Sequence, residues 1–351
     1  MDTEKATQII SNFLNPNSFK DVNVRDGKVI VNLEVPNPHD PTIKEVMTKV
    51  ESELKKDGFK SLDFYTTKAP AQQSQGHRPI GGVKDRGAIA PKTPVEGVKR
   101  IVAVNSGKGG VGKTTCSVNI AVSLANLGHK VGLLDADVTG PNVHQMLGIH
   151  QKPHITDEQK VQSLEAYGVK IISMGLLADP DQPTIWRGPM LDGVIKQFLR
   201  DVDWGELDYL VVDMPPGTSD AQLTLCQNVP LDGTVIISTP QDVALMDARK
   251  GLLMFQKMKV PILGMVENMS FYECPKCSHR EEIFSHGGAE KAAKELDLDF
   301  LGAIPIELKV RTGGDEGKPI TAMDTNHPVS KAFKKIAENI VEKTSKAVAA
   351  V

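Results

Sequence analysis

The spacing of apolar and polar positions predicts helices and strands throughout the first 68 residues. Apolar residues recur with helical spacing over residues 9–14 and 43–54, and they alternate with period two over residues 29–35. A further short strand is expected over residues 62–66. The pattern predicts a small α/β domain over residues 1–68.

The composition of the chain changes after residue 68. Residues 69–98 lack apolar periodicity and are rich in Ala, Pro, Gln and Gly, which predicts a flexible linker. From residue 99 to residue 351, short apolar runs alternate with helical stretches. This repetition predicts an α/β domain with a mostly parallel sheet, covered on both faces, whose ligands bind at the carboxyl ends of the strands.

One strand-to-helix junction of the larger domain carries a glycine-rich sequence. Residues 107–114 read GKGGVGKT and follow the apolar run 101–104. Glycines allow backbone N–H groups to converge on phosphate oxygens, and the N-terminus of the following helix adds positive potential. Lys113 would supply charge to the β- and γ-phosphates, and the Thr114 hydroxyl would complete the coordination of Mg²⁺. The motif therefore predicts a P-loop NTPase domain that binds a nucleotide.

The loop contains a second lysine, Lys108, directly after its first glycine. With it, residues 107–115 resemble the deviant phosphate loop of the MinD, ParA and Mrp ATPases. In that group the early lysine reaches the phosphates of the partner subunit, so the resemblance implies a homodimer and a catalytic role for Lys108 across it. A solvated loop charge is the alternative. The residues expected to bind ATP in this loop are Gly107, Lys108, Gly109, Gly110, Val111, Gly112, Lys113, Thr114 and Thr115.

Three carboxylates follow later strands. Asp135 and Asp137 come directly after residues 130–134, and Asp213 ends the run 207–213. The order of motifs suits Asp213 as the acid that holds Mg²⁺ through its water shell. The resemblance places Asp135 near the metal with Thr114 and Asp213. It also implies that Asp137 orients or activates the attacking water. Lys108, Lys113 and Asp137 are then the catalytic residues of a slow ATPase; a turn-forming Asp pair is the alternative for residues 135 and 137.

Other positions have less specific signals. Asn268 follows the expected strand 262–266, and the resemblance assigns it to the adenine edge, with an ordinary loop asparagine as the alternative. Arg311 is a candidate to join the residues that close the nucleotide pocket. Arg187 is either an interface or phosphate-facing arginine or a surface one. Met246 and its neighbouring methionines are interpreted as core residues of a long helix.

Cys274 and Cys277 have the spacing of a metal or redox pair. One chain offers half of the four cysteines that iron–sulfur clusters and structural zinc prefer, and a twofold axis would bring two such pairs together. Their sequence context resembles the Mrp/ApbC iron–sulfur carriers, which implies a [4Fe-4S] cluster bridging two subunits and apo-protein acceptors. Two readings stay open: a thioredoxin-type pair, and a zinc site within one subunit made by Cys274, Cys277, His279 and His286.

Composition narrows the partners and the compartment. The net charge of -3 gives no basic footprint for nucleic acid, and no apolar run reaches the length of a membrane span. The polar N-terminus is not a signal peptide, and four cysteines suit a reducing compartment, so a cytoplasmic location is expected.

The sequence therefore predicts an ATP-hydrolysing iron–sulfur cluster carrier with neither nucleic-acid nor membrane partners. The alternatives are a MinD/ParA-like positioning or partition ATPase and a zinc-stabilised dimeric ATP-binding protein. The domain over residues 1–68 resembles one fused ahead of the ATPase in Mrp proteins. Its loop 36–41 lacks the cysteine often found there, which favours a docking or regulatory module.

Overall fold

The computed structural model describes residues 3–14, 19–25, 27–35, 41–68, 92–137, 140–156, 160–176, 188–217 and 220–349. The chain divides into two units, Met1–Lys84 and Asp85–Val351, which are described separately. The part of the expected linker before residue 92 lies outside the described residues, and so does Arg187. The predicted domain boundaries stay predictions.

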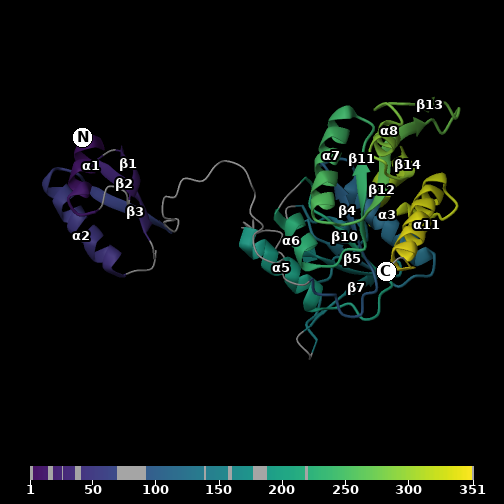
Figure 1. The fold of residues 1–351 in the computed structure, drawn as a ribbon, viewed down its shortest axis with the longest axis horizontal. Helices are drawn as coiled ribbons and strands as arrows, with labels where there is room; N and C mark the ends of the chain where they lie inside the picture. Colours follow the sequence, from purple (N-terminus) through teal and green to yellow (C-terminus); the bar gives the residue numbers. More distant parts are fainter. Residues whose placement is uncertain are drawn as a thin grey trace. The chain divides into compact units, whose positions relative to one another are not determined.

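The first unit is a three-stranded sheet with two helices (Figure 1). Strand β2 pairs antiparallel with β1 and parallel with β3. Alternate residues of β2 are buried against apolar residues of the helices, which agrees with the expected period of two. The elements are α1 (Thr3–Ser11), β1 (Phe19–Arg25), β2 (Lys28–Val35), α2 (Pro41–Lys56) and β3 (Ser61–Lys68).

The second unit is built on a mostly parallel sheet, which confirms the predicted α/β fold class. Its strands pair in the order β13-β12-β11-β4-β10-β5-β8-β7, and β14 also pairs with β12. The two antiparallel pairs lie at the ends of this order. The strands are β4 (Ile101–Ser106), β5 (Val131–Asp135), β7 (Leu164–Ala166), β8 (Val169–Ser173), β10 (Tyr209–Asp213), β11 (Gly233–Ser238), β12 (Ile262–Glu273), β13 (Arg280–Glu281) and β14 (Phe300–Ile306).

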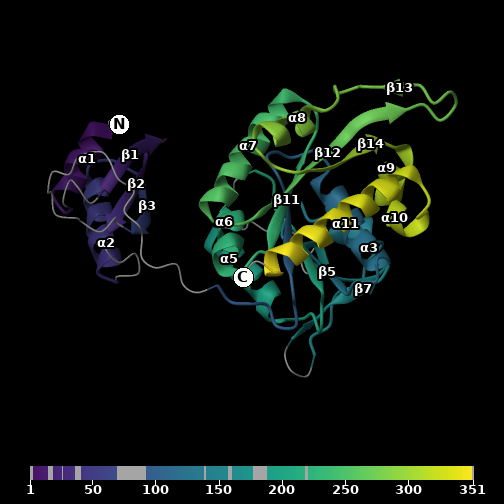
Figure 2. The same ribbon diagram turned by 45° about the vertical axis from the view of Figure 1, so that its right-hand side comes forward.

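Helices cover both faces of this sheet (Figures 1 and 2). Val102 and Val104 of β4 pack with α3 and α11, whereas Ala103 faces the core formed with α5, α6, α7 and α8. This alternation explains why the strands read as continuous apolar runs. The remaining elements are α3 (Lys113–Asn126), α4 (Val143–Met146), β6 (Val161–Gln162), a 3₁₀ turn (Met174–Leu176), α5 (Gly188–Arg200), β9 (Val202–Asp203), α6 (Asp220–Asn228), α7 (Asp242–Lys257), α8 (Gly288–Glu295), α9 (Leu308–Asp315), α10 (Ile320–Met323) and α11 (Pro328–Ala349).

Helix α11 docks on the sheet, as its apolar face predicts. Phe333, Ile336 and Ile340 have no exposed surface, and they pack with α3 and β14. A face already buried in the core is not free to enter a lipid surface, which disfavours the alternative of a membrane-targeting helix. Among the described helices, none has the length and apolar character needed to cross a bilayer.

We expect Ile340→Val to lower the free energy of unfolding of the second unit by about 0.5–1.5 kcal/mol, because it removes one fully buried methylene. Both tryptophans, Trp186 and Trp204, belong to this unit, so their fluorescence during urea unfolding reports on it. Lys335→Gln, on the exposed face of α11, is the control and should change stability by less than about 0.5 kcal/mol. Equal stability of the two variants would contradict docking through this face.

Several expected boundaries and one interpretation need correction. Strand β12 continues to Glu273 instead of ending at residue 266, because its second half pairs with β13 and β14. The last strand, expected from the sequence over residues 300–304, continues to Ile306 as β14, and the strand expected over residues 169–177 ends at Ser173 as β8. Met246 is 63% exposed and is not a core residue, since it lies on the outer face of α7 with Val243 and Leu253.

Candidate functional site

The predicted phosphate loop connects β4 to α3. Gly112 is the N-cap of α3 with φ of 80°, and a Cβ atom there would lie 2.2 Å from Nδ2 of Asn268. Gly107 is equally restricted, because a Cβ atom would lie 2.1 Å from the backbone of Asp247 in α7. Glycine is needed at these two positions for conformation and for close approach of the chain.

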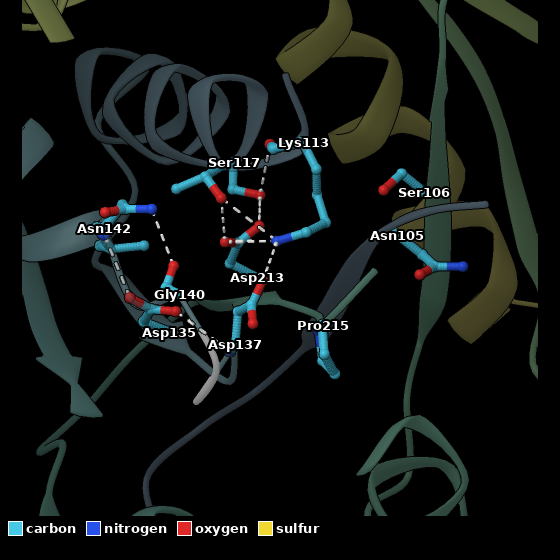
Figure 3. A network of polar contacts seen from close by, with 12 residues as sticks. Asn105, Ser106, Lys113, Ser117, Asp135, Asp137, Gly140, Asn142, Asp213 and Pro215 are labelled. Atoms are coloured by element: carbon cyan, nitrogen blue, oxygen red, sulfur yellow. Dashed lines mark hydrogen bonds and ion pairs between the residues drawn. The ribbon is translucent and has the colours of Figure 1, made fainter. Parts of the chain in front are cut away.

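Lys113, the first residue of α3, is buried among carboxylates. Its ammonium lies 2.8 Å from Oδ2 of Asp213 and 4.0 Å from Oδ2 of Asp137 (Figure 3). Asp213 also accepts hydrogen bonds from Thr114 (2.8 Å) and from Ser117 (2.6 Å). The structure thus brings together four residues that the sequence predicted from separate motifs: Lys113, Thr114, Asp137 and Asp213.

Asp135 lies at the end of β5, beside Asp213 at the end of β10. It accepts hydrogen bonds from Ser173 and from the backbone of Val143. Burial and then the charge of Asp213 raise the pKa of Asp135 to about 7, despite these hydrogen bonds. Two fully buried carboxylates therefore lie side by side in this site.

The buried carboxylates and the Thr114 hydroxyl are oxygen donors of the kind that a hard divalent cation accepts, but the described side chains do not by themselves form a set of three acidic ligands around one point. Asp135, Asp137 and Asp213 lie around the single ammonium of Lys113, and burial, followed by the charge of Asp213, raises the pKa of Asp135. Mg²⁺ prefers carboxylate oxygens together with a hydroxyl such as that of Thr114. Asp213 and Thr114 can accept this ion once a triphosphate draws Lys113 away.

A pocket of about 450 Å³ opens beside the loop. Asn268 lines it from β12, and its Nδ2 donates to the carbonyl of Val111, 2.8 Å away. The predicted base-binding residue is thus within a strand, at the pocket, instead of in a loop after the strand. Arg311 also lines the pocket, with its guanidinium 2.6 Å from Asp315. The other lining residues are Gly112, Thr114, Thr115, Asn142, Gln145, Met146, Met269, Pro305, Ile306, Glu307, Val310, Gly314 and Asp315.

Lys108 follows the first glycine of the loop. Its carbonyl accepts a hydrogen bond from Ser106, which fixes the backbone, and the residue is half-buried. The next two residues, Gly109 and Gly110, are exposed. This part of the loop is accessible to a second molecule.

The Cys-x-x-Cys pair is carried by the turn between β12 and β13. Cys274 and His279 close this turn through a 2.9 Å backbone hydrogen bond. The backbone N–H groups of Lys276 and Cys277, and then the Cys277 thiol, lower the pKa of Cys274. Cys277 is exposed and Cys274 is half-buried, so both sulfurs are at the surface of the hairpin. Backbone donors of this kind favour the thiolate, which is the form that binds metal.

The structure does not assemble the four-residue zinc site considered from the sequence. His279 pairs with Glu281, and His286 contacts Ser270 and Arg280 instead of the cysteines. Across the described ranges, no three His, Cys, Asp or Glu residues are grouped to hold a metal ion. A thioredoxin-type pair is also disfavoured, because the cysteines lie on a hairpin and not at the start of a helix. The other cysteines, Cys116 and Cys226, are buried.

A second pocket, of about 360 Å³, lies on the inner side of this hairpin. Cys274, Phe271 and His327 line it, together with residues 305–307, which also line the nucleotide pocket. The two pockets therefore share one short piece of backbone.

Sequence reasoning missed the residues that hold these parts in place. Glu267 is fully buried, and it accepts hydrogen bonds from Ser270 and from the backbone of Gly287 and Ala289 at the start of α8. Arg280 stacks on Phe271, with 3.7 Å between its Cζ and the ring centroid. A charged residue inside the apolar run before Asn268 was the only signal for Glu267. Ser117 could have been found from its place one helical turn after Lys113.

Most of the chain is similar to known proteins. Residues 97–341 match the ParA family described as NUBPL iron-transfer P-loop NTPases. An iron-sulfur cluster carrier protein of Synechocystis is 45% identical over 337 residues, which cover 94% of this chain and 92% of that protein. An Arabidopsis thaliana protein named as an iron-sulfur protein required for NADH dehydrogenase, mitochondrial, is 52% identical over 249 residues, which cover 71% of this chain and 80% of that protein.

Solved structures show the same fold. A nucleotide-binding protein of Archaeoglobus fulgidus, in complex with ADP, aligns with a TM-score of 0.59 and 36% identity over 68% of this chain and 92% of its own. The cell division ATPase MinD of Pyrococcus furiosus aligns with a TM-score of 0.52 and 26% identity, over 69% of this chain and 98% of its own.

Proposed function

The chain belongs to the NUBPL iron-transfer family of P-loop NTPases, and on that premise we propose that it carries an iron–sulfur cluster. In this proposal a homodimer holds a [4Fe-4S] cluster as cargo between Cys274 and Cys277 of each subunit. ATP is bound and slowly hydrolysed, and the cluster is delivered to apo-proteins. The resemblance noted in the sequence to Mrp/ApbC carriers is confirmed at the level of the family.

The observation that carries the proposal is the position of the two thiols. Cys274 and Cys277 lie at the surface of a hairpin, and no other metal-binding side chain of the described residues joins them. A cubane cluster is held by four thiolates, so one chain supplies half of the set. A twofold axis would bring the same hairpin of a second subunit opposite the first and complete it.

The surface near the phosphate loop supports the homodimer. Val243 and Met246 of α7 are each 63% exposed, and α7 touches the loop at Gly107. Exposed apolar side chains of this kind are usual in the centre of a protein interface. A second subunit packed over the loop would cover them and would bring its own Lys108 to the nucleotide.

The nucleotide site suggests how ATP is processed. Backbone N–H groups of residues 109–114 and the ammonium of Lys113 would bind the phosphates once Lys113 leaves Asp213. Thr114, Asp135 and Asp213 would hold Mg²⁺, which neutralises charge on the phosphate oxygens when bound. Asp137 would orient the attacking water, and Asn268 would contact the base. Positioning and charge stabilisation of this kind account for most of the catalysis in phosphoryl transfer.

We expect Lys108→Ala to reduce ATP turnover by about 100-fold while changing ADP affinity less than about threefold. Lys108 is half-buried and is followed by the exposed Gly109 and Gly110, so we expect its charge to serve the phosphates of a partner subunit more than those of its own. Steady-state phosphate release and equilibrium ADP binding would measure the two effects. Mixing the variant with an Asp137→Asn subunit should restore part of the activity, because one of the two sites then has both residues. Turnover that does not change in Lys108→Ala would contradict a role across the dimer.

The cargo can be tested directly by anaerobic reconstitution with iron and sulfide. A bound cluster gives broad visible charge-transfer absorption, whereas zinc gives none, so the spectrum separates this proposal from a zinc-stabilised dimer. The reconstituted protein should then transfer its cluster to an apo-ferredoxin-type acceptor. Colourless protein that retains stoichiometric zinc would overturn the proposal.

We also infer a cytoplasmic protein with neither lipid nor nucleic-acid partners. The burial of the apolar face of α11 and the net charge of -3 support this inference. Co-sedimentation with anionic vesicles or with DNA in the presence of ATP would support the rival reading of a positioning or partition ATPase. For the domain over residues 1–68, we propose a docking or regulatory role.

A further inference from the structure

A buried pair of amides lies directly beside the phosphate loop. Gln222 projects from α6 and Asn105 from β4, and neither has exposed surface. Nε2 of Gln222 donates to Oδ1 of Asn105 at 2.6 Å and to the carbonyl of Pro215 at 2.5 Å. One amide nitrogen therefore binds both the strand before the loop and the segment after Asp213.

The other atoms of these two amides are unsatisfied. Oε1 of Gln222 and Nδ2 of Asn105 are buried and have no hydrogen-bond partner in the part of the chain that the structure describes. Two primary amides can pair through two reciprocal N–H···O bonds, which would satisfy both atoms. In the present orientation, one hydrogen of the Gln222 nitrogen goes to Asn105 and the other goes to Pro215, and only one of the two reciprocal bonds is made. Unpaired buried polar atoms are costly, so the present arrangement is not the best available to this pair.

The carbonyl of Pro215 belongs to a segment that can respond to the nucleotide. Pro215 lies two residues after Asp213, the proposed Mg²⁺ residue, and beside Asn105 and Ser106 at the end of β4 (Figure 3). Met214 and Gly217 donate backbone hydrogen bonds to Val104 and Ser106. Few hydrogen bonds thus hold residues 214–217 along β4. The hydrogen bond from Gln222 is the one among these that a side chain makes.

Building on the proposed nucleotide site, we propose that Gln222 is a positioning residue that holds residues 214–217 in their present position along β4. When a γ-phosphate displaces these residues, Pro215 releases the Gln222 nitrogen, and the amide turns to make both bonds with Asn105. This second hydrogen bond stabilises the displaced arrangement, so the free energy needed for the displacement is smaller. A ligand shifts such an equilibrium only through its different affinity for the two arrangements, and the γ-phosphate supplies that difference.

Asn105→Leu separates this role from a purely structural one. Leucine has nearly the same shape as asparagine but cannot hydrogen-bond. The substitution removes one bond from the present arrangement and two from the displaced one, so it penalises the triphosphate-bound state more. We expect the affinity for a non-hydrolysable ATP analogue to fall about tenfold relative to the affinity for ADP, which corresponds to about 1.4 kcal/mol.

Calorimetric titration of the full chain with each nucleotide and Mg²⁺, in cluster-free protein, measures this ratio. Thr234→Val is the matched control, because Thr234 carries the other buried oxygen without a partner among the described residues, on β11. It should leave the ratio unchanged. Affinities that fall in parallel for both nucleotides in Asn105→Leu, or that do not change, would overturn the proposal.

A measurement on the unaltered chain keeps the proposal testable if the variant does not fold. Hydrogen exchange of a peptide that covers residues 213–217 should be faster with the ATP analogue than with ADP, because the amides of Met214 and Gly217 leave their partners on β4. Equal exchange with the two nucleotides would refute the displacement. Neither experiment depends on the cargo, so its result is independent of whether the protein carries a cluster.

Discussion

Cys274→Ala and Cys277→Ala are each expected to reduce the iron and sulfide retained after anaerobic reconstitution to less than about one tenth of the wild-type content. In the proposed dimer each substitution removes two of the four thiolates, one from each subunit. A cluster held by the two remaining thiolates has open coordination positions and is lost during desalting. Iron and acid-labile sulfide per subunit, with the visible spectrum, provide the measurement.

Cys226→Ala is the matched control for this experiment. Cys226 is buried in α6, and burial raises the pKa of its thiol to about 11, so it is not available as a thiolate. This variant should retain the full cluster content. ADP binding should also be unchanged in all three variants, since the hairpin contributes no nucleotide ligand. Normal iron and sulfide in the Cys274→Ala, Cys277→Ala double variant would end the proposal for this site.

Lys113→Ala is expected to lower the turnover of ATP by at least about 100-fold. A preorganised cationic donor aimed at the charge of the transition state contributes roughly 3–4 kcal/mol, and each 1.4 kcal/mol is a factor of ten. The substitution also leaves Asp213 without its 2.8 Å ion pair, at full burial. Breaking a buried pair on one side destabilises a protein by about 3–5 kcal/mol, so thermal unfolding must be measured beside phosphate release. Lys113→Gln, which keeps a hydrogen-bond donor, reduces the risk that the variant does not fold.

Lys99→Ala is the control variant, because it removes the charge of a paired lysine that is exposed instead of buried. Lys99 also pairs with an aspartate at 2.8 Å, but its side chain is 67% exposed. An exposed pair contributes little, so turnover and stability should be close to wild type. If Lys113→Ala hydrolyses ATP at the wild-type rate, the lysine has no catalytic role. If it binds and transfers the cluster normally in cells as well as in vitro, the nucleotide is not part of the transfer mechanism.

The sequence was sufficient to predict the parts of the site that depend on a local motif or on the end of a strand. The phosphate loop depends on a local spacing of glycines, Lys113 and Thr114, and this spacing folds in the same way wherever a strand precedes it. The three aspartates could be assigned because each follows a strand, and the carboxyl ends of parallel strands meet at one edge of the sheet. Asp135, Asp137 and Asp213 do meet there.

Features that depend on pairing between distant segments could not be predicted in the same way. The length of β12 is set by β13 and β14, which pair with its second half, and not by its own apolar run. For the same reason Asn268 was expected after the strand, and Glu267 was not recognised as the buried carboxylate that holds the start of α8. Met246 has the spacing of a core residue, but it lies with Val243 and Leu253 on the side of α7 that stays exposed. An apolar pattern does not distinguish a core contact from a surface that a second molecule covers.

Residues 305–307 line the nucleotide pocket on one side and the pocket beside Cys274 on the other. An occupant of one pocket that shifts these residues therefore moves a wall of the other pocket. Thermodynamic reciprocity then requires that, if a nucleotide changes the affinity for an occupant of the second pocket by some factor, that occupant changes nucleotide affinity by the same factor. In the proposed carrier, an inhibitor that shifts residues 305–307 from the pocket beside the phosphate loop would therefore alter the surroundings of Cys274 without touching a sulfur atom.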